Sequence, residues 1–102
     1  MIVTLFRARL KAEVQEEYGR WTVRMGELAQ KMRGYVSHKR FVADDGEQVT
    51  IVEFESEEAQ RAWSLHPEHV EAKKKGRGSF YLEYRAQICT VQRSSVFPKE
   101  GQ

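Results

Sequence analysis

The sequence lacks the features that would cross-link the chain covalently or direct it into or across a membrane. Cys89 is its only cysteine, so no intrachain disulfide can form. No apolar run approaches the roughly 18–20 residues that span a bilayer, which argues against a transmembrane helix. The first residues carry arginines within the apolar stretch and are not followed by a small-residue cleavage site, unlike a signal peptide. We therefore expect a cytoplasmic protein.

Charge of either sign is not in large excess. There are 17 lysines and arginines against 15 aspartates and glutamates, a net charge of +2. This balance favours neither a nucleic acid nor a membrane surface as partner. A length of 102 residues fits one domain with a small core. We expect that domain over residues 1–93, followed by a short tail at 94–102 that is frayed or lies across a neighbouring molecule.

Hydrophobic periodicity predicts the first half of the fold. Residues 2–10 alternate as a strand, and residues 13–33 carry one apolar helical stripe that ends at Gly34. Residues 35–43 and 48–55 are rich in β-branched and aromatic residues. The Asp45–Gly46 step between them is typical of a hairpin turn with positive φ.

Capping residues predict the second half. Ser56 is placed to begin a helix that runs to about Leu65, and Pro67 begins another, with His66 as its cap. Three lysines close that helix before Gly76, where a left-handed turn is expected. Residues 79–93 read as the last strand. The order β-α-β-β-α-β predicts an α+β, ferredoxin-like fold with one antiparallel sheet and the helices on one face.

Such a sheet leaves its other face bare, and apolar residues are expected there. They are Val3, Leu5, Val49, Ile51 and Val91. Because small domains rarely expose a surface of this kind, we expect a homodimer that packs sheet against sheet.

Four segments in this order carry a family resemblance: "GYVSHKRF", "DGEQVTIVEFES", "AW..HPEH" and "GRGSFYLEYRAQIC". They resemble the antibiotic biosynthesis monooxygenase (ABM) family over about residues 2–93. The resemblance implies a dimeric α+β barrel with a ligand pocket between sheet and helices. It also implies oxygenation of aromatic substrates without metal or flavin, so we expect no cofactor.

The resemblance carries over to individual residues only in part. Haem-degrading relatives use an asparagine on the first strand, a tryptophan at the second helix and a histidine about ten residues later. Trp63 matches the tryptophan, but the chain has no asparagine and Lys73 stands at the third position. For cofactor-free oxygenases the resemblance points to Trp63 and to an arginine on a strand, such as Arg7 or Arg40.

The segment "AWSLHPEH" holds the candidate catalytic residues. His69 or His66 is a candidate general base or hydrogen-bond partner for a phenolic substrate, because imidazole exchanges protons near neutral pH. The structural alternative is that His66 caps a helix and His69 packs. Trp63 is either a pocket wall or a core aromatic. A zinc site of His38, His66 and His69 is a further alternative.

Other residues are candidates for binding a substrate. Tyr84 is expected on the helix-covered face of the last strand, whereas Tyr81 is expected to face the barrel interior or the dimer interface. Phe6 and Met25 are expected to line the core or the pocket. Arg77 is expected to form a salt bridge or to contact a substrate oxygen.

The function that we expect is oxygenation of a small aromatic or quinol-like compound by a homodimer. A non-catalytic module that binds or senses such a ligand in the same pocket is the alternative. Haem binding or degradation is a third possibility.

Overall fold

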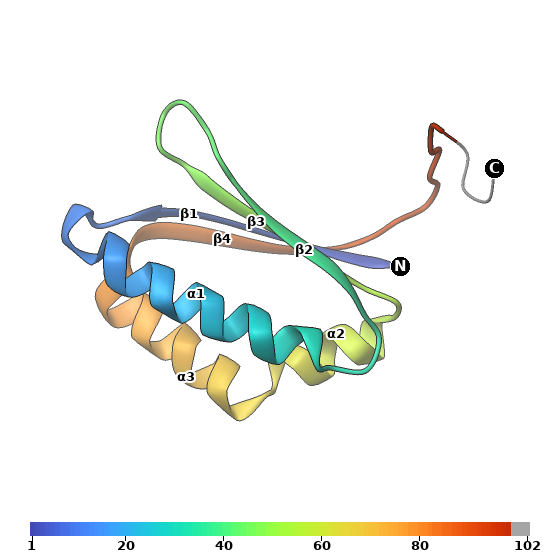
Figure 1. Cartoon of the computed structure of the whole chain (residues 1–102), viewed down its shortest axis with the longest axis horizontal. Coiled ribbons are helices and arrows are strands. Elements are labelled where there is room, and N and C mark those ends of the chain that lie inside the picture. The colour runs from blue at the N-terminus through green and yellow to red at the C-terminus, as the bar shows by residue number, and fades with distance from the viewer. Residues whose placement is uncertain (99–102) are drawn as a thin grey trace.

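A computed structural model describes residues 1–98, and in them a four-stranded antiparallel sheet carries the helices on one face (Figure 1). The sheet has the order β2-β3-β1-β4. The elements are β1 (Ile2–Leu10), α1 (Gln15–Gln30, after a short 3-10 turn at Ala12–Val14), β2 (Tyr35–Val42), β3 (Gln48–Phe54), α2 (Glu57–Ser64), α3 (Pro67–Lys75) and β4 (Tyr81–Thr90). The predicted ferredoxin-like fold is confirmed. No helix of residues 1–98 is long and apolar enough to cross a membrane.

The predicted start of α2 and the predicted β2–β3 turn agree with the structure, whereas α1 ends earlier than predicted. Helix α1 ends at Gln30 with Lys31 as its cap, and Gly34, with φ +85°, lies in the loop before β2. Gly46 has φ +90° in the β2–β3 turn. The Ser56 hydroxyl accepts a hydrogen bond from the Ala59 amide at 3.1 Å and caps α2. These turns and caps could be predicted from the sequence because each depends on one residue type at one backbone position.

Gly76 differs from its prediction. Its φ is −58°, so no left-handed turn forms, and the chain continues as a π-helical turn, η2 (Gly76–Phe80). A Cβ at this position would collide with the Tyr81 ring. Glycine is thus required for a close packing contact, and β4 begins at Tyr81 rather than at residue 79.

A β-bulge changes the face on which Tyr81 lies. Arg9 pairs with Glu83 but Leu10 pairs with Tyr81, so Leu82 is an extra residue on β4. Tyr81 consequently points to the helices and packs against Tyr18, with ring centroids 5.7 Å apart. The prediction that Tyr81 faces the barrel interior or a dimer interface is therefore wrong.

The helix-facing side of the sheet is fully buried at its two ends. At one end Phe54 is buried together with Ala29 and Trp63, and at the other Ala8, Tyr18 and Phe80 are buried. Between these ends Thr4, Phe6 and Thr50 keep partial solvent exposure although they point toward the helices. We call these three residues the central strip.

The opposite face of the sheet carries no helix (Figure 1). The register places four of the predicted apolar residues there: Val3, Leu5, Val49 and Ile51. Arg7 lies on the same face and forms a two-pronged ion pair with Glu47, with N–O distances of 3.1 and 3.0 Å. Arg7 is thus turned away from the space between sheet and helices.

Candidate active site

The junction of α2 and α3 brings Trp63 and His69 into direct contact. The two rings stack nearly parallel, with centroids 4.3 Å apart and an angle of 11° between the planes. His69 Nδ1 lies 3.0 Å from the Trp63 carbonyl oxygen. Because a carbonyl only accepts, Nδ1 carries the proton and donates it, which leaves the lone pair on Nε2.

Burial keeps this imidazole neutral. It lowers the pKa of His69 from 6.5 to about 4, and the nearby Lys73 and His66 act in the same direction. The hydrogen bond to Trp63 opposes the shift but does not cancel it. At neutral pH His69 therefore presents a fixed tautomer, with Nε2 as a hydrogen-bond acceptor.

His66 has a structural task in the same corner. Its Nδ1 accepts a hydrogen bond from the Glu68 amide at 3.2 Å, which caps α3, and Pro67 occupies the first helical position. With Nδ1 as acceptor, the proton of the neutral ring is on Nε2, which can only donate. The capping role predicted for His66 is confirmed.

Lys73 stabilises the corner from α3. Its Nζ donates to the Ser64 carbonyl at 2.9 Å and to the Ser64 hydroxyl at 2.8 Å, at the C-terminal end of α2. Burial lowers the pKa of Lys73, and Arg77 lowers it further. Arg77 itself is exposed in η2 and forms no ion pair within residues 1–98, so the predicted salt bridge is not seen.

The remaining predicted residues lie elsewhere in the sheet–helix interface. Phe6 stacks on Tyr84 with ring centroids 5.6 Å apart, and it packs against Tyr81 at 5.4 Å with the two rings tilted by 59°. Met25 packs against the core that contains Trp63. The structure thus brings together Trp63, His66 and His69 on the helices, and separately Phe6 and Tyr84 on the sheet.

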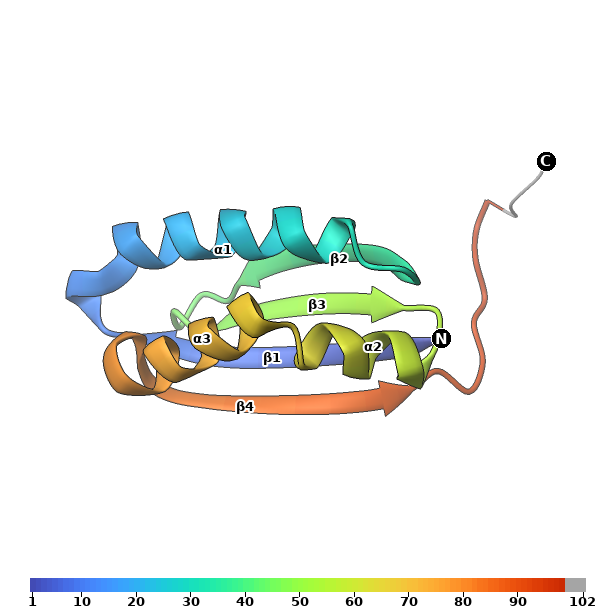
Figure 2. The same cartoon turned by 90° about the horizontal axis from the view of Figure 1, so that it is seen from below.

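Helix α3, which carries His69, lies in the helix layer in front of the sheet (Figure 2). Two ion pairs join α1 to α3. Arg24 contacts Glu68 through two N–O contacts of 3.1 Å, and Lys75 Nζ lies 3.0 Å from Glu17. The hydrogen bonds from Arg24 lower the pKa of Glu68.

Two polar contacts were missed by the sequence-based reasoning. The Tyr35 hydroxyl lies 2.7 Å from His38 Nδ1, and the His38 ring packs against Gly26 of α1. A register irregularity between Tyr35 and Ser37 puts Tyr35 and His38 on one face, which strict alternation does not predict. Glu68 was visible inside "HPEH", but its partner Arg24 is 44 residues away.

The zinc alternative has no support in the geometry. Within residues 1–98, no three histidine, cysteine or acidic side chains come close enough to hold a metal ion. His38 is engaged by Tyr35 on β2, and His66 is engaged as a helix cap.

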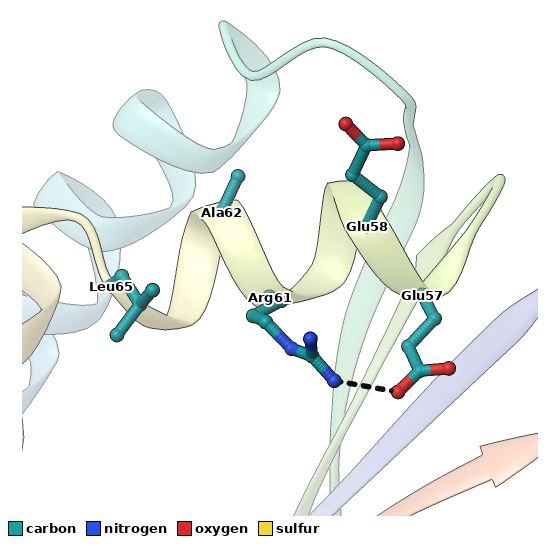
Figure 3. Close-up of a pocket in the computed structure, with 5 residues that line it drawn as sticks. All are labelled: Glu57, Glu58, Arg61, Ala62 and Leu65. Carbon is teal, nitrogen blue, oxygen red and sulfur yellow. Dashed lines mark hydrogen bonds and ion pairs between the residues drawn. The ribbon is translucent and has the colours of Figure 1, made fainter.

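One surface hollow of about 440 Å³ lies on α2 (Figure 3). It is lined by Glu57, Glu58, Arg61, Ala62 and Leu65. All five are exposed, Glu57 and Arg61 form an ion pair, and none is a predicted site residue. An open hollow in which three of the five lining side chains are charged is a poor match to a site for an aromatic ligand, which usually is concave and enclosed.

Comparison with known proteins agrees with this fold. Residues 1–75 match the family described as antibiotic biosynthesis monooxygenase. The chain belongs to this family. The uncharacterised protein YqjZ of Bacillus subtilis (strain 168) is 32% identical over 88 residues, which are 86% of this chain and 77% of YqjZ.

Solved structures share this fold at low sequence identity. Rv0793 from Mycobacterium tuberculosis has a TM-score of 0.82 at 11% identity, covering 93% of this chain and 98% of its own. SnoaB, a cofactor-independent oxygenase from Streptomyces nogalater, has a TM-score of 0.78 at 15% identity, covering 96% and 97%. At these identities the likeness establishes the fold and not the reaction.

Proposed function

We propose that this ABM protein is a monooxygenase that uses neither metal nor flavin and acts on a small aromatic or quinol-like compound. The observation that carries the proposal is His69, a neutral imidazole with a fixed tautomer that is stacked on a buried tryptophan. Membership of the family and the fold shared with the oxygenase SnoaB support the same class of reaction.

The proposed binding region is the central strip and the residues that adjoin it. Phe6 and Tyr84 offer aromatic faces on the sheet, and Met25 offers an adaptable apolar side chain on α1. In this proposal, the stacked rings of His69 and Trp63 border the region from the helix layer. A flat ring between the two layers would have apolar surfaces on both sides and Nε2 as an acceptor for a hydroxyl group.

The chemistry needs a substrate that supplies its own electrons. An activated ring CH₂ group, as its enolate, passes an electron to O₂. One oxygen atom then ends in a new C=O group, and the other leaves with the two hydrogens as water. The balance is CH₂ + O₂ → C=O + H₂O, without another reductant. The protein has to bind the enol, accept its hydroxyl proton and exclude bulk water.

The low pKa of His69 restricts the substrates that it can serve. A base of pKa about 4 takes a proton from a group of pKa ~7 at a cost of about 4 kcal/mol, since each unit is 1.36 kcal/mol. For an ordinary phenol of pKa ~10 the cost doubles. We therefore place acidic enols and polyhydroxylated aromatics first among the substrates, with His69 orienting the hydroxyl and receiving its proton.

We also propose that the protein is a homodimer joined through the helix-free face of the sheet. Val3, Leu5, Val49 and Ile51 form the apolar centre of that face, and Arg7 and Glu47 lie beside them. A second copy would bury the apolar centre, and in a two-fold dimer this patch would meet its own copy.

A non-catalytic binding protein is the second candidate, and the pKa of His69 is what favours it. A weak base can accept a hydrogen bond from a bound phenol without removing its proton. This candidate predicts saturable binding of aromatic compounds without oxygen consumption.

Oxygen uptake distinguishes the proposed monooxygenase from the non-catalytic binding protein. Chelator-treated protein is mixed with a panel of anthrones and hydroxynaphthols while dissolved oxygen and ligand binding are followed. The proposal predicts uptake by the native chain and its loss in His69→Phe, which keeps the aromatic stack but not Nε2. His66→Ser retains a capping acceptor and is expected to keep most of the activity. Binding without uptake in the native chain would favour the binding protein.

A further inference from the structure

Part of the helix-facing side of the sheet is left uncovered along β4. Tyr84, Ala86 and Ile88 pair with residues of β1 that point to the helices, yet Tyr84 is 44% exposed and Ile88 58% exposed. We call these three residues the β4 strip. It adjoins the central strip, because Tyr84 stacks on Phe6. The proposed binding region is therefore open toward the β4 edge.

The C-terminal tail holds apolar side chains that contact little of the same chain. After Thr90 the chain leaves the sheet, and the backbone hydrogen bond from the Val91 amide to the Met1 carbonyl ties only its start. Both views show the tail extending away from the helices and the sheet (Figures 1 and 2). Val96 is 56% exposed and Phe97 is 97% exposed. Covering this apolar pair with another apolar surface would be favourable.

We propose that the tail of one copy packs on the β4 strip of the second copy, with Phe97 set against Tyr84 and Ile88. The partner copy would then contribute an aromatic residue to the edge of the ligand site. The occupant is a second copy because the tail leaves the far end of β4 pointing away from its own strip (Figures 1 and 2).

The length of the tail permits this exchange. Phe97 lies seven positions beyond Thr90, which is a reach of about 23 Å in extended chain. Sheets packed face to face lie about 10 Å apart. The tail is thus long enough to leave one sheet and to pass round the β4 edge of a partner packed against the helix-free face.

The chemistry of the two surfaces matches. Phe97 and Tyr84 are aromatic, Ile88 and Val96 are aliphatic, and Ala86 between Tyr84 and Ile88 leaves room for a ring. Covering the strip would remove the open edge beside Phe6 and so exclude water from the region where proton transfer is proposed. In this consequence the inference rests on the proposed function, whereas the contact itself does not.

Cross-linking tests the contact directly. In a Cys89→Ser background, Ile88→Cys and Phe97→Cys are combined in one chain and treated with a short bis-maleimide. The matched control combines Phe97→Cys with Leu65→Cys, because Leu65 is similarly exposed (68%) but lies on α2. Products are resolved by denaturing gel and intact mass.

The inference predicts a covalent dimer that forms roughly tenfold faster, or more, than in the control, because a docked tail raises the effective concentration of its cysteine. A monomer carrying one internal cross-link would overturn it, since the tail would then fold back on its own strand. Equal rates in the two variants would overturn it as well. Oxygen uptake is measured separately, so a dimer without activity would reject the proposed function alone.

Discussion

Acidification provides a direct test of the environment assigned to His69. The pKa of this histidine is about 4 in the folded chain against 6.5 for an unperturbed imidazole, so below pH 6.5 the unfolded chain binds more protons than the folded one. Its contribution to stability is therefore complete above pH 6.5 and is lost progressively as the pH falls toward 4. Between pH 7 and pH 5 the loss is about 2 kcal/mol.

Urea denaturation at pH 7, 6 and 5 measures this loss. For a chain of this size, about 2 kcal/mol lowers the urea midpoint by roughly 1–2 M. His69→Phe removes the titrating group and keeps an aromatic ring against Trp63, so its midpoint should fall less over the same range. If both proteins lost stability equally between pH 7 and pH 5, the buried, neutral His69 would be refuted.

Three further predictions concern packing and the contact between helices. Trp63→Ala leaves a cavity beside Phe54 and should lower the free energy of unfolding by about 3–5 kcal/mol in urea titrations. A loss below about 1 kcal/mol would show that Trp63 is not a core residue. Gly76→Ala forces the Tyr81 ring to move and should lower the free energy of unfolding by about 1–3 kcal/mol. Gly78→Ala is the control, because a Cβ at Gly78 meets no atom within 4 Å. Equal losses in the two variants would disprove the close contact between Gly76 and Tyr81. Exchanging the charges as Arg24→Glu with Glu68→Arg should restore the thermal midpoint lowered by either single change, and additive losses would show that the ion pair does not form.

Much of the fold was predictable from single residues with local effects. Ser56, His66 and Gly34 each act within a few residues of the chain, through a cap or a backbone conformation that few residue types adopt. The order of helices and strands followed from the change of hydrophobic period. Their packing on one face of the sheet followed from the topology rather than from any particular contact.

The errors arose where an irregular backbone changed the direction of side chains. The bulge at Leu82 turned Tyr81 toward the helices, and the irregularity near Ser37 paired Tyr35 with His38. No alternation of apolar residues signals such an insertion. Gly76 was interpreted as a helix terminator, but the constraint on it is the Tyr81 ring, which tertiary packing places there.

The residues of the candidate site could be predicted from the sequence, but their contacts with one another could not. Trp63, His66 and His69 lie within seven residues, so their clustering was visible. Which histidine caps and which one stacks depends on how the α2–α3 corner is closed, and Lys73 contributes to that corner through Ser64. The contacts between Phe6 and Tyr84 depend on a register between strands at opposite ends of the chain.

Isotope labelling tests the central claim most directly. Chelator-treated protein is given an anthrone under ¹⁸O₂, and the product is analysed by mass spectrometry, with His69→Phe in parallel. The account predicts one ¹⁸O atom in the new carbonyl group, and a rate that falls on the order of a hundredfold in the variant. A product without ¹⁸O, or turnover that appears only after a metal ion or flavin is added, would contradict it.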